Sequence, residues 1–355
     1  MLIFKRLIVW IILFVIALTQ LLLYIPNFSC RGSSACLDQF NFSIIGSSSV
    51  TQDFINSIKE FLKLLSYLAI DMGWSRDLTD SDIYREEKLV DTFDSENVYK
   101  VNYFGYCKKR HGERLYCVQN WGSGMDVLGI LVRDIGIQLG MLSASHQNDT
   151  RLLGDSMVLT YHLALSSLRR FLRGDQGNAL SKLVISKDDY ASSKSDAKTS
   201  RYSKGVDMAY LLKVANKFLL LIELCELSTS LLFLTAVICF GIALSMGIKL
   251  RIIPLVLKIM ISALASLATI TFTGTIIYFL ALRSLQPSKD PLQSSTKWDI
   301  IKINLGPGFI IGCIRYAIQI ILIPLAFLIA RHYSAREKET KEAKIEPPGF
   351  QNDWL

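Results

Sequence analysis

The chain has 355 residues, 51% of them hydrophobic, and carries a formal net charge of +8. The apolar residues are concentrated in a few long blocks, which excludes a soluble globular protein and predicts an α-helical integral membrane protein. The basic total does not indicate nucleic-acid binding, because the short cytoplasmic flanks of membrane spans are enough to produce it.

The first apolar block runs from Leu7 to Ile25 and is long enough to cross a bilayer, at about 1.5 Å of rise per helical residue. A cleaved signal peptide is the alternative, but the block is longer than a usual signal core and no small-residue cleavage site follows it. Lys5 and Arg6 precede the block, so the positive-inside rule places the N-terminus in the cytoplasm and the long polar segment that follows outside it.

Two features indicate that this polar segment lies in a lumen or outside the cell. All three glycosylation sequons of the chain fall in it, at Asn27, Asn41 and Asn148. So do four cysteines in polar sequence: Cys30, Cys36, Cys107 and Cys117. Four cysteines allow three pairings, and we favour Cys30 with Cys36 and Cys107 with Cys117, because each is the nearest neighbour in sequence.

The stretch from Asn102 to Trp121 predicts a β-hairpin clamped by a disulfide between Cys107 and Cys117. The preceding residues, from Asn97 to Tyr106, are rich in β-branched and aromatic side chains, and His111-Gly112 supplies a turn between the cysteines. The tip is strongly basic, with Lys108, Lys109, Arg110 and Arg114. It is either a solvated turn or a contact for anionic lipid headgroups or acidic wall polymer.

Helical periodicity marks Thr51 to Ile70 and, less cleanly, Met125 to Leu142 and Met157 to Leu172. We predict that these helices form a layer over a small β-sheet, although the first could instead lie on the membrane surface. Gly174 to Gly205 is rich in Ser, Lys, Asp and Gly and predicts a solvated linker. A helix resumes near Val206 and leads into the second span.

Three further apolar blocks and the basic residues beside them complete a topology of four spans with both termini in the cytoplasm. The third span carries a stripe of small residues that predicts a packing face: Ser262, Ala265, Ser266, Thr269 and Thr273. The predicted segments are a cytoplasmic N-terminus (1–6), a first span (7–25), a large loop domain (26–226), a second span (227–248), a cytoplasmic turn (249–254), a third span (255–282), a second outer loop (283–307), a fourth span (308–330) and a basic cytoplasmic tail (331–355).

The chain carries no set of residues that indicates catalysis. Gly154-Asp155-Ser156-Met157 resembles the nucleophile block of GDSL-type hydrolases, but no D-x-x-H arrangement follows it, and we interpret it as a turn and N-cap before a helix. The four histidines are scattered, and phosphate loops and dinucleotide fingerprints are absent. We therefore predict a protein that is not an enzyme, with no catalytic residue, metal site, cofactor, small-molecule substrate or nucleic-acid partner.

Arg315 lies about two turns inside the predicted last span, where an unpaired charge costs about 3 kcal/mol. We predict a structural ion pair that joins the second and fourth spans, with Glu226 or Glu223 as the partner. The alternatives are a side chain that reaches back to the headgroups and a role in permeation or ligand binding.

This layout resembles the fungal claudin-like four-span proteins, which include the eisosome and PalI-type families and the Fig-type mating proteins. Those families carry a glycine and two cysteines in a large first outer loop, and Gly105, Cys107 and Cys117 match that pattern in order and spacing. The resemblance implies a claudin-like fold, in which a disulfide-braced α+β loop domain is carried by four transmembrane helices. The chain departs from most members in its longer first loop and from PalI-type proteins in its short tail.

Within that group, the total length, loop size and tail are most similar to those of a yeast protein of the spore membrane. The resemblance implies a non-enzymatic, meiosis-specific protein that organises the prospore membrane and helps it to extend and bend around the nucleus. Its partners are expected to be membrane lipids and other membrane proteins or further copies of itself, by lateral association. The alternatives are a channel-associated regulator of calcium entry or cell fusion, which polar residues facing one another on several spans would favour, and a plasma-membrane eisosome component.

Overall fold

The computed structural model describes residues 2–31, 36–45, 92, 94–109, 115–119, 124–143, 147–172, 195–246, 253–285 and 301–324. The predicted amphipathic helix Thr51–Ile70, most of the hairpin tip, the first part of the predicted linker and the basic tail lie outside these residues. The chain divides into two compact units. The helical unit comprises Met1–Ile25, Leu221–Thr273 and Ile310–Leu355, and the sheet unit comprises Pro26–Leu220 and Gly274–Phe309.

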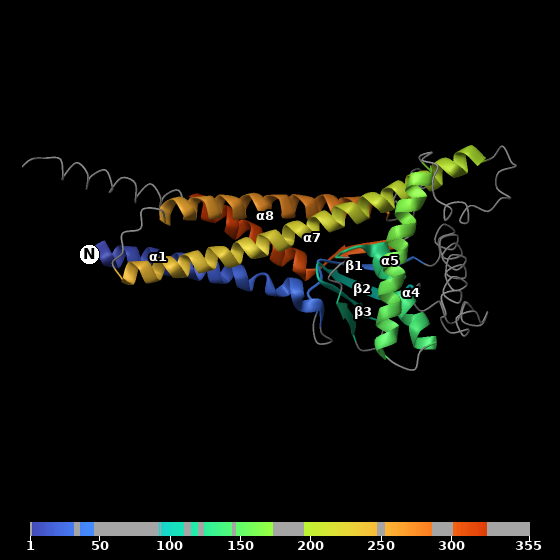
Figure 1. Ribbon diagram of the computed structural model, residues 1–355, viewed down its shortest axis with the longest axis horizontal. Helices are drawn as coiled ribbons and strands as arrows, with labels where there is room; N and C mark the ends of the chain where they lie inside the picture. Colours follow the sequence, from blue (N-terminus) through green and yellow to red (C-terminus); the bar gives the residue numbers. More distant parts are fainter. Residues whose placement is uncertain are drawn as a thin grey trace, which may run out of the picture. The chain divides into compact units, whose positions relative to one another are not determined.

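Within the described residues, four helices are long and apolar enough to cross a membrane, at Leu7–Cys30, Val206–Ala243, Leu255–Arg283 and Pro307–Pro324. They include α1 (Leu2–Leu22), α7 (Ser195–Ser245) and α8 (Ile253–Arg283), and the last of them follows β5 (Ile301–Leu305) (Figure 1). The chain is therefore an α-helical membrane protein. Because α7 already begins at Ser195, the end of the segment predicted as a solvated linker is helical.

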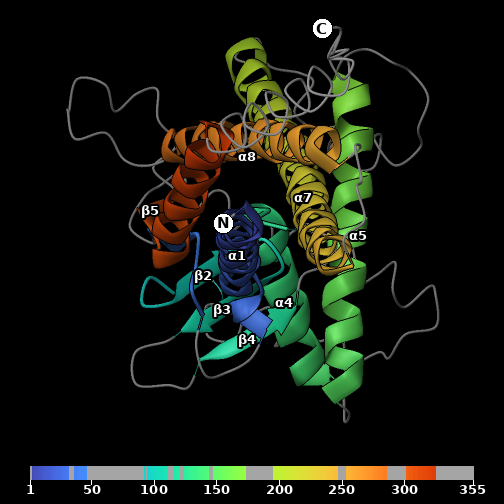
Figure 2. The same cartoon turned by 90° about the vertical axis from the view of Figure 1, so that its left-hand side faces the viewer.

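The helical unit has an apolar core to which all of its helices contribute. The buried residues are Leu13 and Ala17 of α1, Phe233 and Val237 of α7, Leu257, Ile261 and Leu264 of α8, and Leu322. Trp10 also donates a hydrogen bond from Nε1 to the carbonyl oxygen of Val237 (2.8 Å) and lies against Gly241, where any larger side chain would collide with its ring. Figure 2, which looks nearly along α1, shows α7, α8 and the helix Pro307–Pro324 around it.

Most residues of the predicted packing face on the third span do not pack against other helices of this chain. Ser262, Ser266, Thr269 and Thr273 are exposed, whereas Ala265 is buried. The hydroxyl groups of Ser266 and Thr269 donate to the carbonyl oxygens four residues earlier in α8, so they need no partner on another helix.

The sheet unit is built around an antiparallel sheet in the order β4-β3-β2-β1-β5. Its strands are β1 (Phe40–Ile44), β2 (Val98–Asn102), β3 (Gly105–Lys109), β4 (Tyr116–Gln119) and β5 (Ile301–Leu305). The last strand comes from the segment predicted to be only a second outer loop. It pairs with β1 along five residue positions, from Phe40 opposite Leu305 to Ile44 opposite Ile301.

The aromatic run from Asn97 to Tyr106 forms two strands, because the chain turns back at Tyr103 and Phe104. Asn102 stabilises the turn, since its Oδ1 accepts a hydrogen bond from the backbone nitrogen of Tyr103 (2.7 Å). Both turn side chains are buried in the core of the unit, which explains why an aromatic pair occupies a position where turn-forming residues are usual.

The helix α4 (Val127–Ser143) packs on the sheet with Ile130, Leu131 and Ile135, and α5 (Gln147–Leu172) packs on α4 (Figure 1). The prediction of a turn at Gly154 to Ser156 is wrong, because these residues lie inside α5. A Cβ atom at Gly136 would lie 2.8 Å from the Cα atom of Gly154. Gly154 therefore permits a close helix crossing rather than a turn.

Candidate functional site

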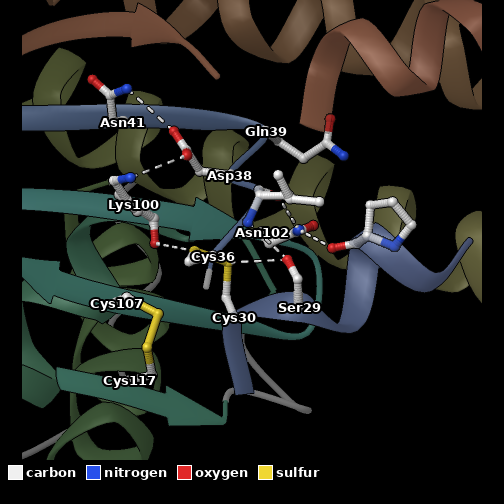
Figure 3. The surroundings of a disulfide bond; sticks show 12 residues. Ser29, Cys30, Cys36, Asp38, Gln39, Asn41, Lys100, Asn102, Cys107 and Cys117 are labelled. Atoms are coloured by element: carbon white, nitrogen blue, oxygen red, sulfur yellow. Dashed lines mark hydrogen bonds and ion pairs between the residues drawn. A yellow bond between two sulfur atoms is a disulfide. The ribbon is translucent and has the colours of Figure 1, made fainter. Parts of the chain in front are cut away.

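The sheet is clamped at one edge by the disulfide between Cys107 and Cys117 (Figure 3). These two residues are directly opposite each other in the pairing of β3 with β4. Strand pairing therefore places the two side chains side by side, and the disulfide can form across the hairpin without a change in the backbone.

A second disulfide, between Cys30 and Cys36, lies next to the first. Cys30 belongs to the short helix η1 (Ile25–Arg31), and both cysteines are buried. The sulfur atoms of Cys30, Cys36 and Cys107 lie within 4.8 Å of one another. Because all three are consumed in disulfides, they offer no thiolate to a metal ion, and the group is a covalent brace.

Gly105 is the position at which the two braces meet. A Cβ atom there would lie 2.5 Å from the carbonyl oxygen of Cys30 and 3.1 Å from that of Val118. Only glycine lets the Cys30 backbone approach β3 this closely. The Gly105, Cys107 and Cys117 pattern noted in the sequence therefore has a common physical reason: the glycine makes room for one disulfide loop beside the strand that carries the other.

Asn102 ties the ends of this disulfide loop to the sheet. Its Nδ2 donates to the carbonyl oxygens of Pro26 (2.8 Å) and Leu37 (2.6 Å), which flank the Cys30–Cys36 loop. Ser29 adds a bond within the loop, from the backbone nitrogen of Leu37 to its Oγ (2.8 Å). A single buried amide thus connects the β2–β3 turn to both sides of the loop.

The predicted glycosylation sites have different surroundings. Asn27 is 4% exposed, and its Oδ1 accepts a hydrogen bond from Gln39 (3.2 Å). Asn41 lies half-buried in β1 and donates to Asp38 (3.1 Å). Asn148 lies in the first turn of α5. Asn27 is therefore poorly suited to carry a glycan on the folded unit.

Lys108 is not part of a solvated tip. Its Nζ lies 3.1 Å from Asp134 Oδ2, and the same oxygen accepts hydrogen bonds from Thr92, Tyr99 and Gln138. Lys109 is exposed, while Arg110 and Arg114 lie outside the described residues. Lys108 therefore belongs to the interior of the sheet unit and not to the exposed basic cluster of the hairpin.

Two phenols in the sheet unit are held neutral by their surroundings. Burial raises the pKa of Tyr106 well above its ordinary value of 10.0, and the nearby Asp134 raises it further. Burial likewise raises the pKa of Tyr161, with a contribution from Asp126. A phenol of this kind is a poor base at neutral pH, so these groups fit a structural role.

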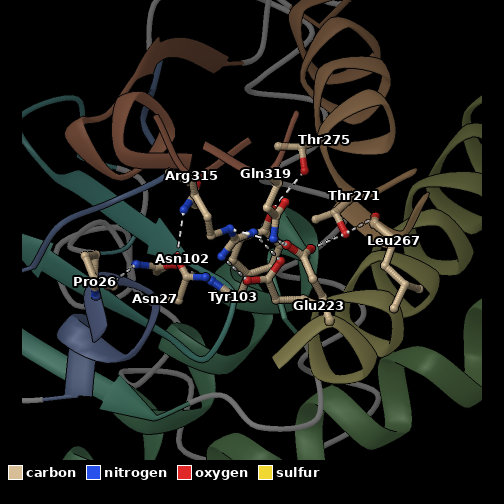
Figure 4. A network of polar contacts seen from close by, with 12 residues as sticks. Pro26, Asn27, Asn102, Tyr103, Glu223, Leu267, Thr271, Thr275, Arg315 and Gln319 are labelled. Carbon is tan, nitrogen blue, oxygen red and sulfur yellow. Dashed lines mark hydrogen bonds and ion pairs between the residues drawn. The ribbon is translucent and has the colours of Figure 1, made fainter. Parts of the chain in front are cut away.

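The helical unit contains a buried ion cluster (Figure 4). Arg315, 6% exposed, donates from both terminal nitrogens to the two oxygens of Glu223, at 2.8 and 3.0 Å. Its Nε lies 3.5 Å from Oε1 of Glu226. The structure thus brings together all three residues of the predicted ion pair, with Glu223 as the bidentate partner and Glu226 as the more distant one, and the Arg315 side chain is buried among these partners.

Sequence reasoning missed the polar residues that surround these charges. Glu226 also accepts hydrogen bonds from Gln319 (3.0 Å) and Thr271 (2.8 Å), and the guanidinium of Arg315 stacks 4.2 Å above the ring of Tyr24. Sequence spacing could have identified Gln319, because it is four residues after Arg315 and so lies on the same face of the helix. Polar side chains from four helices therefore meet inside the apolar unit.

The whole chain is similar to proteins of a single family. It matches the family model described as Spore membrane assembly protein 2 over residues 2–343. A relative of that name from Candida glabrata is 47% identical over 352 residues, covering 94% of this chain and 96% of the relative. One from Saccharomyces cerevisiae strain S288c is 44% identical over 348 residues, covering 95% and 94%. One from Eremothecium gossypii is 29% identical over 336 residues, covering 87% and 83%. No solved structure gives a significant match.

Proposed function

Because the chain belongs to the spore membrane assembly protein 2 family, we propose that it acts in the assembly of the prospore membrane during sporulation. The observation that carries this proposal is the match of nearly the full chain, spans and sheet unit together, to relatives with that name. The function is non-enzymatic. The chain anchors in the growing membrane through its four helices and presents a rigid sheet unit at its surface.

The proposed orientation places the sheet unit in the lumen and both termini in the cytoplasm. Two disulfides within the sheet unit support it, because such bonds persist in the secretory pathway and are rare in the cytosol. The positive-inside rule supports it independently. The basic residues Lys5, Arg6, Lys249 and Arg251 flank the ends of the spans that are not connected to the sheet unit, and those ends are therefore expected in the cytoplasm. In this orientation the sequons at Asn41 and Asn148 meet the glycosylation machinery during synthesis.

The architecture proposed for the chain is claudin-like. Three observations support the assignment: the disulfide between Cys107 and Cys117 in the sheet, the glycine Gly105 in the strand that carries Cys107, and the four candidate spans. In such an arrangement the sheet unit can contact neighbouring proteins or further copies laterally. A bulky rigid unit on one side of a membrane crowds that side, and this would favour extension and bending of the prospore membrane around the nucleus.

A fluorescent fusion to the C-terminus tests the proposed function when it is followed through vegetative growth, mating and sporulation. Signal confined to the growing spore membrane is the expected result, together with defective spore membranes in a deletion strain. Signal at mating tips would overturn it in favour of a regulator of calcium entry or fusion. Stable plasma-membrane patches would instead favour an eisosome component.

A further inference from the structure

Among the residues that the structure describes, the charges of the ion cluster in the helical unit do not balance when both carboxylates are ionised. It contains the carboxylates of Glu223 and Glu226, both 0% exposed, and the guanidinium of Arg315. The bidentate pair of Arg315 with Glu223 is neutral, which leaves the cluster with one negative charge on Glu226. A charge in the interior of a membrane protein is costly unless a partner compensates it, and such sites commonly serve ions.

A buried amide oxygen without a hydrogen-bond partner belongs to a residue that contacts this charge. Gln319 donates from Nε2 to Glu226 (3.0 Å), while its buried Oε1 has no hydrogen bond in the structure. Gln20, 1% exposed, has no hydrogen bond to either of its amide atoms. Gln20 of α1 lies four residues before Tyr24, which follows the end of α1 and contacts Arg315, and both are buried, so Gln20 continues the buried stripe to which Tyr24 belongs.

The polar residues form two tiers. The first holds Arg315, the two carboxylates and Tyr24. One helical turn further along the respective helices lie Gln319, Ser230 and Gln20, all at most 2% exposed. The second tier is rich in neutral oxygen atoms and contains no charge of its own. It therefore supplies the ligands that a small cation takes from a protein, next to the carboxylate that supplies the charge.

We propose that this cluster binds one monovalent metal cation, with Na⁺ as the ligand that fits best. Glu226 supplies the negative charge, because Glu223 already uses both oxygens for Arg315. Each carboxylate oxygen of Glu226 has lone pairs beyond the hydrogen bonds it accepts. Gln319 Oε1, on the amide group that contacts Glu226, is one neutral ligand, and Gln20 and Ser230 provide further oxygens.

The charge count selects the ligand. A monovalent cation makes the cluster neutral, whereas a divalent cation would reverse its charge and would also cost more to desolvate. A bound water molecule would satisfy an amide oxygen but would leave the charge of Glu226 in place. The inference concerns the helical unit alone and does not depend on which membrane the protein occupies.

Sodium binding to the full-length protein in lipid nanodiscs tests the proposal. Radioactive sodium should bind with a stoichiometry near one. At constant ionic strength, replacing N-methyl-D-glucamine by sodium should raise the melting midpoint by roughly 2–4 °C when sodium is about tenfold above its dissociation constant. Glu226→Gln should abolish both effects, because the cluster is then neutral without a cation. Glu223→Gln should do the same, since Arg315 then pairs with Glu226.

Two further variants separate the site from a general effect of charge. Gln319→Leu keeps every charge and removes one ligand, so it should weaken sodium binding roughly tenfold. If the glutamate variants do not fold, this variant decides whether the cluster is the sodium site. Asp155→Asn removes an exposed carboxylate that pairs with Arg133 in the sheet unit and should leave sodium binding unchanged. The proposal is overturned if wild-type protein binds no sodium, if Glu226→Gln still binds it, or if the melting midpoint responds only to pH or only to calcium.

Discussion

The two units of the chain solve the same problem of holding distant segments together by opposite means. The sheet unit uses covalent bonds and strand pairing, with two disulfides meeting at Gly105. The helical unit uses apolar packing and one buried cluster of charges around Arg315. The difference teaches that each unit relies on interactions that its surroundings do not weaken. Water around the sheet unit cannot break a disulfide, and lipid around the helical unit offers no hydrogen bonds that would replace those of a buried ion pair.

Removing Arg315 should produce the largest loss of stability. Arg315→Leu leaves two buried carboxylates without their cation, which should lower the free energy of unfolding by about 3–5 kcal/mol and strongly reduce the yield of folded protein. The measurement is the yield and melting midpoint of full-length protein. Ile314→Leu, at an exposed position on the same helix, is the control. A normal yield of Arg315→Leu would contradict the assignment of a structural ion pair. A higher yield when Glu223 is also changed to leucine would strengthen that assignment.

Opening the hairpin clamp should cost less. Replacing Cys107 and Cys117 by alanine should lower the stability of the sheet unit by about 2–3 kcal/mol, since it releases a loop of modest length in the unfolded chain. Membrane insertion should be unchanged, because neither cysteine lies in a span. Protease protection reports insertion and thermal unfolding reports stability. Cys225→Ala, at an exposed free cysteine of α7, should affect neither. A double alanine variant that fails to insert would show that the units are not independent.

Substitution of Gly105 tests the contact between the two disulfides. Gly105→Ala should destabilise the sheet unit by about 1–3 kcal/mol, because the new Cβ forces the Cys30 backbone away from β3. Gly312→Ala is the matched control in the helical unit, where a Cβ meets nothing within 4 Å. That change should be neutral or stabilising by up to about 1 kcal/mol. Equal effects of the two substitutions on the melting midpoint would contradict the close approach at Gly105.

Tyr106 should have the smallest effect, and only in alkali. Its pKa is raised above the ordinary value of 10.0 in the folded protein, so the folded state holds its proton more tightly than the unfolded state. This stability is complete below pH 10 and is lost as the pH rises through the folded pKa. Tyr106→Phe should be close to neutral at pH 7, because the hydroxyl has no hydrogen bond in the structure, and should reduce alkaline destabilisation. A large loss of stability at pH 7 would show that the hydroxyl has a bonding role.

The local signals in the sequence foretold much of this architecture. Long apolar blocks indicated the helices that can cross a membrane, and an arginine inside one of them pointed to its acidic neighbours on another. Such inferences succeed because hydropathy and charge act over single helices. They needed no knowledge of which segments meet in space.

Contacts between remote segments could not be predicted in the same way. β5 pairs with β1 across more than 250 residues of sequence, and no short pattern around Ile301 identifies its partner. Gly154 was misread as a turn because a glycine at a helix crossing and a glycine in a turn look alike in sequence. Gln319 and Gln20 were overlooked because an uncharged side chain in an apolar block gives a weak signal until its neighbours are known.

The most direct test of the proposed function compares two chains in a sporulating deletion strain: the wild-type protein and the variant with alanine at Cys107 and Cys117. Electron microscopy scores closed spore membranes in cells where the fluorescent fusion has reached that membrane. The wild-type chain should restore closure, whereas the variant should reach the membrane and leave most membranes open or misshapen. Full closure with the variant would contradict the view that the braced sheet unit carries the assembly function.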